Sequence, residues 1–189
     1  NILYENLKNP VNIVLPGAVQ LTQVNDANSN VTLTKTTSIP GANFTAKPKP
    51  GSKEAFVRVR GLVNGKPTLS EPKLFRVKSP PDGVGAVFGN KQYNNNSEIS
   101  VRNLLTGEVT GSRPKEFDYD FNVEVTSFTI EVKPNQPQPI TGKYIEGLAA
   151  DFIRSARPGT AIIFNDIKGI MWEGSDKSSA VPYHIKTFS

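Results

Sequence analysis

Residues 2–17 read ILYENLKNPVNIVLPG, and this stretch decides how the chain begins to fold. Apolar and polar side chains alternate at its start, and a second apolar run, residues 11–15, follows Asn9-Pro10. Proline fixes its own φ and pushes the preceding residue toward an extended backbone. We therefore predict two short strands, residues 2–7 and 11–15, which are broken at the proline.

The start of the sequence carries no charged segment followed by an apolar leader and a cleavage motif. We therefore expect the 189 residues to be an internal or C-terminal piece of a longer protein. No apolar run in them approaches the roughly 20 residues that a membrane-spanning helix needs.

Composition excludes several kinds of site. The chain has no cysteine, which excludes a disulfide framework and a Cys-ligated zinc or iron–sulfur centre. His184 is the one histidine, which excludes a multi-histidine zinc site. An apolar content of 37% with 21% charged residues indicates an ordinary soluble globular protein, rich in Pro, Asn and Thr as all-β proteins often are.

The clearest domain boundary is Ser79-Pro80-Pro81-Asp82-Gly83. Tandem prolines stiffen the backbone and remove two hydrogen-bond donors, and Asp-Gly favours a turn. The net charge changes sign here. Residues 1–80 carry 11 Lys and Arg against 4 Asp and Glu, a net charge of +7, whereas residues 81–189 carry 11 against 13, a net charge of −2. We predict two domains, residues 1–79 and residues 80–189.

The first domain is predicted to consist of strands. Ala55, Val57 and Val59 share one face of a strand over residues 55–63. Asn64-Gly65 is a strong hairpin signal because both residues tolerate a positive φ, and we expect the return strand to include residues 74–77. Six or seven short strands in about 80 residues are typical of an immunoglobulin-like β-sandwich.

The basic excess of the first domain could serve a nucleic acid or another acidic surface. More often, Lys and Arg are simply spread along solvated strand faces. The densest basic cluster, Lys47-Pro48-Lys49-Pro50-Gly51-Ser52-Lys53, is predicted to be a surface loop, and it has no aromatic side chain for base stacking. We therefore expect no nucleic-acid partner.

The second domain is built around residues 116–133. Odd-numbered apolar side chains from Phe117 to Val125 share one face, and even-numbered ones from Phe128 to Val132 follow. A change of parity within a period-2 pattern needs an extra residue, so we predict a β-bulge near Thr126-Ser127.

Apolar residues at helical spacing follow a Pro-rich turn: Ile145, Leu148, Ala149, Phe152 and Ile153. They predict one amphipathic helix, about residues 143–157, that ends at Pro158-Gly159. Residues 160–164 and 181–188 are predicted to be strands, and residues 97–105 a short helix capped by Ser97 and ending before Gly107. The predicted fold class is mainly β: an immunoglobulin-like β-sandwich followed by a β-rich α+β domain that contains this helix.

Candidate chemistry is sparse. Asp118 and Asp120 would lie roughly 6–7 Å apart on one strand face, within range for calcium or acid–base work, but no Gly-rich ligand loop accompanies them. His184 has no Ser or Asp partner in a recognisable motif and is expected at a surface or strand edge. Met171 and Trp172 could form a sugar-stacking or partner surface, although packing is the commoner role for such a pair. We expect no catalytic, cofactor or metal site, no small-molecule substrate and no enzymatic activity.

Several segments together resemble the C-terminal region of the GldM/PorM family. The opening residues 1–17 are similar to the start of the family's repeat domain, and Phe75-Arg76-Val77-Lys78 with Pro80-Pro81 resembles its end. In the second domain, Phe117-Asp118-Tyr119-Asp120-Phe121 with residues 125–129, and Phe164-Asn165-Asp166-Ile167-Lys168 after Arg157-Pro158-Gly159, resemble family segments in the same order.

This resemblance implies a periplasmic part of the gliding-motility and type IX secretion machinery of Bacteroidetes. The parent protein would have an N-terminal transmembrane helix that joins an inner-membrane motor. Its periplasmic β-rich domains would be homodimeric and would reach an outer-membrane-associated ring, which the second domain would contact. The role implied is mechanical, and stiff proline joints suit it better than a flexible linker would. Self-association about a two-fold axis is expected.

Two other functions stay open on the sequence. An extracellular carbohydrate-binding or adhesin module would need exposed aromatic side chains, for which Tyr93, Trp172 and Tyr183 form the plausible set. A hydrolase that uses Asp118 and Asp120 is the weaker alternative.

Overall fold

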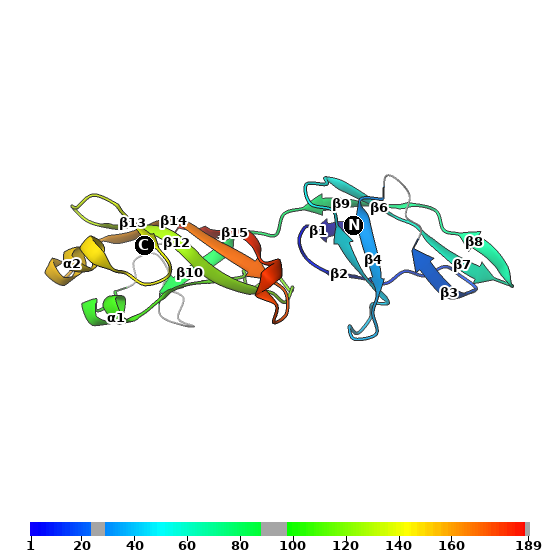
Figure 1. Ribbon diagram of the computed structural model, residues 1–189, viewed down its shortest axis with the longest axis horizontal. Coiled ribbons are helices and arrows are strands. Elements are labelled where there is room, and N and C mark those ends of the chain that lie inside the picture. The colour runs from blue at the N-terminus through cyan, green and yellow to red at the C-terminus, as the bar shows by residue number, and fades with distance from the viewer. Residues whose placement is uncertain (24–28, 88–97, 188–189) are drawn as a thin grey trace. The chain divides into compact units, whose positions relative to one another are not determined.

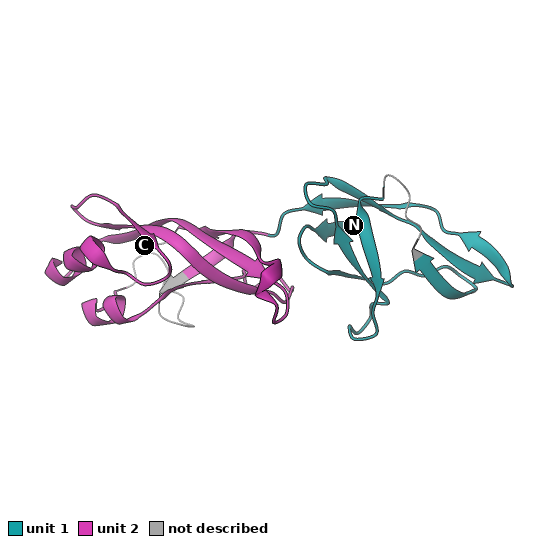
Figure 2. Cartoon of the chain, viewed as in Figure 1, with its two compact units in different colours: residues 1–80 teal, residues 81–189 magenta. Residues whose placement is uncertain are grey.

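The computed structural model describes residues 1–23, 29–87 and 98–187. The chain divides into two compact units, residues 1–80 and 81–189 (Figure 2). Strands dominate both units, which confirms the predicted mainly β class. Tyr93 and Ser97, two residues named in the sequence analysis, lie outside the described residues.

Residues 1–23 and 29–80 of the first unit form three sheets of three strands each. The first has the order β1-β9-β6 and consists of β1 (Ile2–Tyr4), β9 (Lys73–Lys78) and β6 (Glu54–Val57). The second has the order β2-β5-β4 and consists of β2 (Asn9–Val11), β5 (Phe44–Pro48) and β4 (Val31–Lys35). The third has the order β3-β7-β8 and consists of β3 (Ala18–Gln23), β7 (Val59–Val63) and β8 (Lys66–Leu69).

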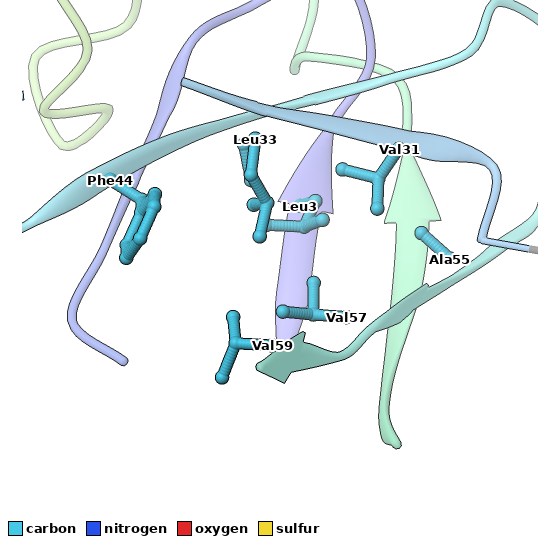
Figure 3. Close-up of a cluster of buried hydrophobic side chains, with 8 residues drawn as sticks. Leu3, Val31, Leu33, Phe44, Ala55, Val57 and Val59 are labelled. Atoms are coloured by element: carbon cyan, nitrogen blue, oxygen red, sulfur yellow. The ribbon is translucent and has the colours of Figure 1, made fainter. Parts of the chain in front are cut away.

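The first two sheets share a hydrophobic core. Figure 3 shows Leu3 from β1 and Leu33 from β4 pointing toward one another between the strands. The alternation that the sequence predicts is observed, since Ala55, Val57 and Val59 are all buried. The complete cluster comprises Leu3, Val31, Leu33, Phe44, Ala46, Ala55, Val57 and Val59.

The predicted break at Asn9-Pro10 is wrong, because both residues lie inside β2. The chain turns earlier, over residues 5–8, between β1 and β2. Pro10 is tolerated because β2 is an edge strand of its sheet, where a missing N–H need not disrupt the ladder. Lys47 and Pro48 are likewise part of β5, so the predicted basic surface loop is shorter than expected.

The hairpin predicted at Asn64-Gly65 is confirmed. Asn64 has a φ of 51° and Gly65 a φ of 74°, as a two-residue hairpin turn requires. Its return strand is β8, however, and not residues 74–77, which belong to β9 in another sheet. The strand predicted over residues 55–63 is interrupted at Arg58 and continues into a second sheet as β7.

The second unit has one six-stranded sheet in the order β11-β10-β15-β14-β12-β13. Its strands are β10 (Gly83–Val87), β11 (Val109–Ser112), β12 (Asn122–Val132), β13 (Gln138–Thr141), β14 (Ile162–Trp172) and β15 (Val181–Lys186). Its helices are α1 (Val101–Thr106), α2 (Gly147–Ser155) and the short 3-10 helix η1 (Lys177–Ser179). Figure 1 shows α1 and α2 together at one end of the sheet.

The predicted bulge is confirmed. The pairing of β12 with β14 shifts register between Val125 and Ser127 and again between Ser127 and Thr129. Phe128, Ile130 and Val132 therefore face the core after the shift, as Val125 does before it.

Two strands have other bounds than the pattern predicts. The pattern places the spine strand over residues 116–133, but the strand begins at Asn122. β14 continues far beyond the predicted 160–164, to Trp172, so that its 11 residues match the 11 of β12.

Ile185, in β15, is buried within the second unit and is 1% exposed. A Cβ atom at Gly111 would lie 2.5 Å from its Cδ1, and one at Gly169 would lie 3.0 Å from it. A Cβ at Gly169 would also lie 2.8 Å from the carbonyl oxygen of Glu124. The two glycines thus leave the space that this side chain fills.

Both helices differ from their predicted bounds. The Ser100 hydroxyl, and not Ser97, caps α1 by accepting a hydrogen bond from the Asn103 N–H, and the helix ends before Gly107 as predicted. α2 is shorter than residues 143–157, and its buried side chains are Ala149, Ala150 and Ile153. Leu148, predicted on the buried face, is 61% exposed. Positions 149, 150 and 153 define a face centred roughly 145° around the helix axis from position 148.

Candidate functional site

The candidate carboxylate pair lies outside the strands of the second unit. Asp118 and Asp120 lie in the irregular segment before β12, and both are exposed. Asp120 Oδ1 is 3.8 Å from Arg113 Nη1, a loose surface pair. The aromatic residues on either side of them, Phe117 and Phe121, point inward instead, since both are buried. The segment therefore serves packing, with its acidic side chains left in solvent.

Those aromatic side chains continue into a cluster with Tyr183. The ring centroids of Phe117 and Phe121 are 6.0 Å apart, and those of Phe121 and Tyr183 are 5.5 Å apart. The Tyr183 hydroxyl donates a hydrogen bond to the Pro81 carbonyl at 2.8 Å, which fixes the first residue of the second unit to β15. Burial, with a smaller contribution from the Asp82 carboxylate, raises the pKa of Tyr183 to about 12.

His184 follows Tyr183 on the opposite, solvated face of β15. Its Nδ1 lies 3.3 Å from Asp82 Oδ1, and both side chains are at least half exposed. The prediction of a surface position is confirmed, and the contact adds a second, weak tie between the start of the unit and β15.

Met171 and Trp172 are separated by the pleat of β14. Met171 is buried, whereas Trp172 is half-buried with Lys177 Nζ 5.4 Å from its ring centroid. Lys177 Nζ also donates to both carboxylate oxygens of Glu124 at 2.7 Å. Since Tyr183 is buried too, the aromatic set proposed for carbohydrate stacking keeps only the partly covered Trp172 among the described residues.

No group of three or more His, Cys, Asp or Glu side chains that could hold a metal ion occurs within residues 1–23, 29–87 and 98–187. Over the same ranges, the helices are all too short or too polar to cross a bilayer.

The candidates for partner binding are three exposed apolar side chains in and beside the helices of the second unit. We call Val101, Tyr144 and Leu148 the helix patch. Val101 is 40% exposed, Tyr144 48% and Leu148 61%. Val101 begins α1, Leu148 lies in α2, and these two helices contact each other. Sequence reasoning missed this surface because it placed Leu148 in the core.

A polar cluster fixes the helix patch. Glu108, just after α1, forms an isolated β-bridge with Tyr144, just before α2. The Glu108 carboxylate pairs with Lys143 Nζ and accepts a hydrogen bond from the Tyr144 hydroxyl at 3.3 Å. The hydrogen bond from Lys143, followed by its charge, lowers the pKa of Glu108 in spite of partial burial. An ordered apolar surface with a charged rim is typical of a protein–protein contact.

Comparison with known protein families assigns the second unit. Residues 81–186 match the family model for the GldM C-terminal domain, which covers nearly all of the second unit and more than half of the chain. No curated protein sequence matches the chain significantly.

Proposed function

Because the chain belongs to the GldM family, whose members are structural components of the gliding-motility and type IX secretion machinery, we propose that it transmits force in that machinery. In this proposal it lies in the periplasm and forms part of a homodimeric connection between an inner-membrane motor and an outer-membrane-associated ring. The observation that carries the proposal is the family match over residues 81–186.

The strand arrangement of the first unit supports a mechanical role. β1 and β9 are parallel neighbours, with Ile2 opposite Arg76 and Tyr4 opposite Lys78. The Arg76 N–H donates to the Asn1 carbonyl at 3.1 Å, and the Glu5 N–H donates to the Lys78 carbonyl at 2.9 Å. Tension between the start of β1 and the end of β9 pulls these parallel strands past each other. Their hydrogen bonds are then loaded together, whereas peeling would load them one after another.

The helix patch supports partner binding by the second unit. Burying exposed apolar side chains gives roughly 25 cal/mol per Å², and large residues near the centre of an interface carry most of the binding energy. We propose that the helix patch contacts the outer-membrane-associated ring.

The test is a pull-down of outer-membrane-associated envelope proteins with the whole chain and with Leu148→Glu. The variant places a charge in the proposed interface, and we expect it to lose at least about tenfold in recovered ring protein. Arg154→Gln, at an exposed position in the same helix, is the matched control, since it also lowers the net charge by one and loses only a surface ion pair with Asp151. Equal recovery by Leu148→Glu and the unmodified chain would contradict the proposed contact.

A further inference from the structure

The outer face of the sheet β1-β9-β6 carries an open groove of about 760 Å³. Three basic residues, Lys53, Arg76 and Lys78, line it together with Glu54, Phe56 and Asn30. We propose that this groove binds an extended segment of a partner protein with acidic side chains at alternate positions.

Basic side chains outnumber acidic ones in the groove, with Lys53, Arg76 and Lys78 against Glu54. No ion pair joins Lys53, Arg76 or Lys78 to a carboxylate within the part of the chain that the structure describes. In the second unit, by contrast, Lys133, Lys143 and Lys177 each meet a glutamate. The first unit carries the net charge of +7 noted above, so the field around the groove favours an acidic partner.

The spacing of the cations indicates an extended ligand. Arg76 and Lys78 alternate along β9 with Phe75 and Val77, which pack against the core. Side chains two residues apart on one face of a strand are separated by roughly 6.5–7 Å. An extended peptide repeats at the same distance, so acidic residues at positions i and i+2 would meet the two cations in register.

The partner would bind through side chains and not by adding a strand to the sheet. The outer edge of β6 is already covered, because the Phe56 N–H donates to the Ser29 carbonyl at 2.8 Å. The Glu54 carbonyl on the same edge accepts a hydrogen bond from Asn30 Nδ2 at 3.4 Å. β-Augmentation, the usual way in which an extended peptide joins a sheet, is therefore not available at the edge of β6.

Other contents of the groove favour a peptide over a polyphosphate or nucleic acid. Glu54 stands opposite Arg76 in the antiparallel pair of β6 with β9, and its carboxylate would repel a uniformly charged anion. Phe56 is half-buried and lines the same groove, so it offers an apolar contact to a peptide side chain that lies two residues beyond the acidic pair and therefore faces the groove as they do. A mixed peptide satisfies the cations, the carboxylate and the aromatic ring together. This inference concerns the first unit and does not depend on the proposed function.

The test uses fluorescence anisotropy with the whole chain and two labelled peptides of equal composition. In one, glutamate alternates with threonine, and in the other the glutamates form one block. We expect the alternating peptide to bind at least about fivefold more tightly, since only it matches the strand spacing. Arg76→Glu with Lys78→Glu should abolish that binding.

The matched control is Lys35→Glu with Lys47→Glu, which changes the net charge equally on exposed residues of the β2-β5-β4 sheet. It should retain most of the preference for the alternating peptide. Equal loss in the control, equal binding of both peptides, or stronger binding of inorganic polyphosphate would overturn the proposal. Circular dichroism of each variant excludes unfolding as the cause of a loss.

Discussion

Asn9 connects three segments of the first unit through one buried side chain. Its Oδ1 accepts a hydrogen bond from the Tyr4 N–H at 2.6 Å, and its Nδ2 donates to the carbonyls of Tyr4, Leu7 and Ala46 at 2.9, 2.8 and 3.0 Å. The Asn9 side chain thus supplies hydrogen bonds to backbone groups at the turn between β1 and β2, where the strand pairing is interrupted. A buried amide with this many partners is costly to remove, because the groups left behind lose their hydrogen bonds.

We predict that Asn9→Ala destabilises the first unit by about 3 kcal/mol, since several buried backbone groups lose their partners. When urea unfolding is monitored by far-UV circular dichroism, the transition of the first unit should move to a lower urea concentration. Trp172, the one tryptophan, lies in the second unit, so the transition followed by its fluorescence should not move. Asn12→Ala, at an exposed position in the same segment, should leave both transitions in place.

We predict that Gly169→Ala destabilises the second unit by about 2 kcal/mol, because its new Cβ would meet the Glu124 carbonyl in the paired strand. Gly111→Ala should lower the free energy of unfolding by less, since the atom nearest to its new Cβ is the terminal Cδ1 of the Ile185 side chain. The Trp172 fluorescence transition in urea measures both effects. Adding Ile185→Val should relieve Gly111→Ala but not Gly169→Ala, and equal relief of both would contradict this account.

At the scale of elements, a few contacts tie the edges of the second sheet to its helices. β11 and β13 are the edge strands, and the pair Glu108–Lys143 joins the residue before β11 to the segment after β13. The Val109 N–H supports this link by donating to the Lys143 carbonyl at 2.7 Å. The Glu108–Lys143 ion pair therefore helps to hold the backbone beside Tyr144 of the helix patch in place. It contributes less to the stability of the hydrophobic core.

The lowered pKa of Glu108 predicts a pH effect. Because the folded pKa lies below the ordinary value of 4.5, the stabilisation is present above about pH 4.5 and is lost as the pH falls through the folded pKa. We expect Glu108→Gln to make the stability of the second unit less dependent on pH below 4.5. Urea titrations with Trp172 fluorescence at several pH values measure the slope, and an unchanged slope would contradict the prediction.

The parallel pair β1–β9 predicts a directional resistance to force. The chain has no cysteine, so pairs of cysteine handles can be introduced at chosen residues. Pulling between residues 1 and 79 loads the pair in shear, whereas pulling between residues 1 and 73 peels it from one end. Single-molecule force measurements should give a clearly higher unfolding force in the first geometry, and equal forces would argue against a mechanical role for this pair.

At the scale of the whole molecule, self-association stays a prediction from the family resemblance and from the exposed strand edges. We expect dimers of the 20.6 kDa chain in sedimentation equilibrium at tens of micromolar. Raising the salt concentration should have little effect if apolar surface drives the contact. Sedimentation as a monomer throughout this range would show that the chain alone does not carry the dimer contact.

Much of the local structure could be predicted from the residues alone. The Asn64-Gly65 turn, the bulge near Thr126-Ser127 and the end of α1 before Gly107 each follow from backbone preference or from side-chain period. These signals act within a few residues of the chain, so no knowledge of distant segments is needed to interpret them. The same holds for the buried row of alternate residues that leads from β6 into β7.

Pairing and exposure were decided only by the tertiary structure. Residues 74–77 form a strand as predicted, but which strand they join depends on segments far away in the chain. The exposed position of Leu148 follows from the way in which α2 rests on Ala149, Ala150 and Ile153, and the basic groove exists because β6 and β9 meet. The sequence by itself thus determined the family, the mainly β class and the local turns. The partner of each strand and the side chains left for binding arise from long-range contacts, whose free energy no local pattern encodes.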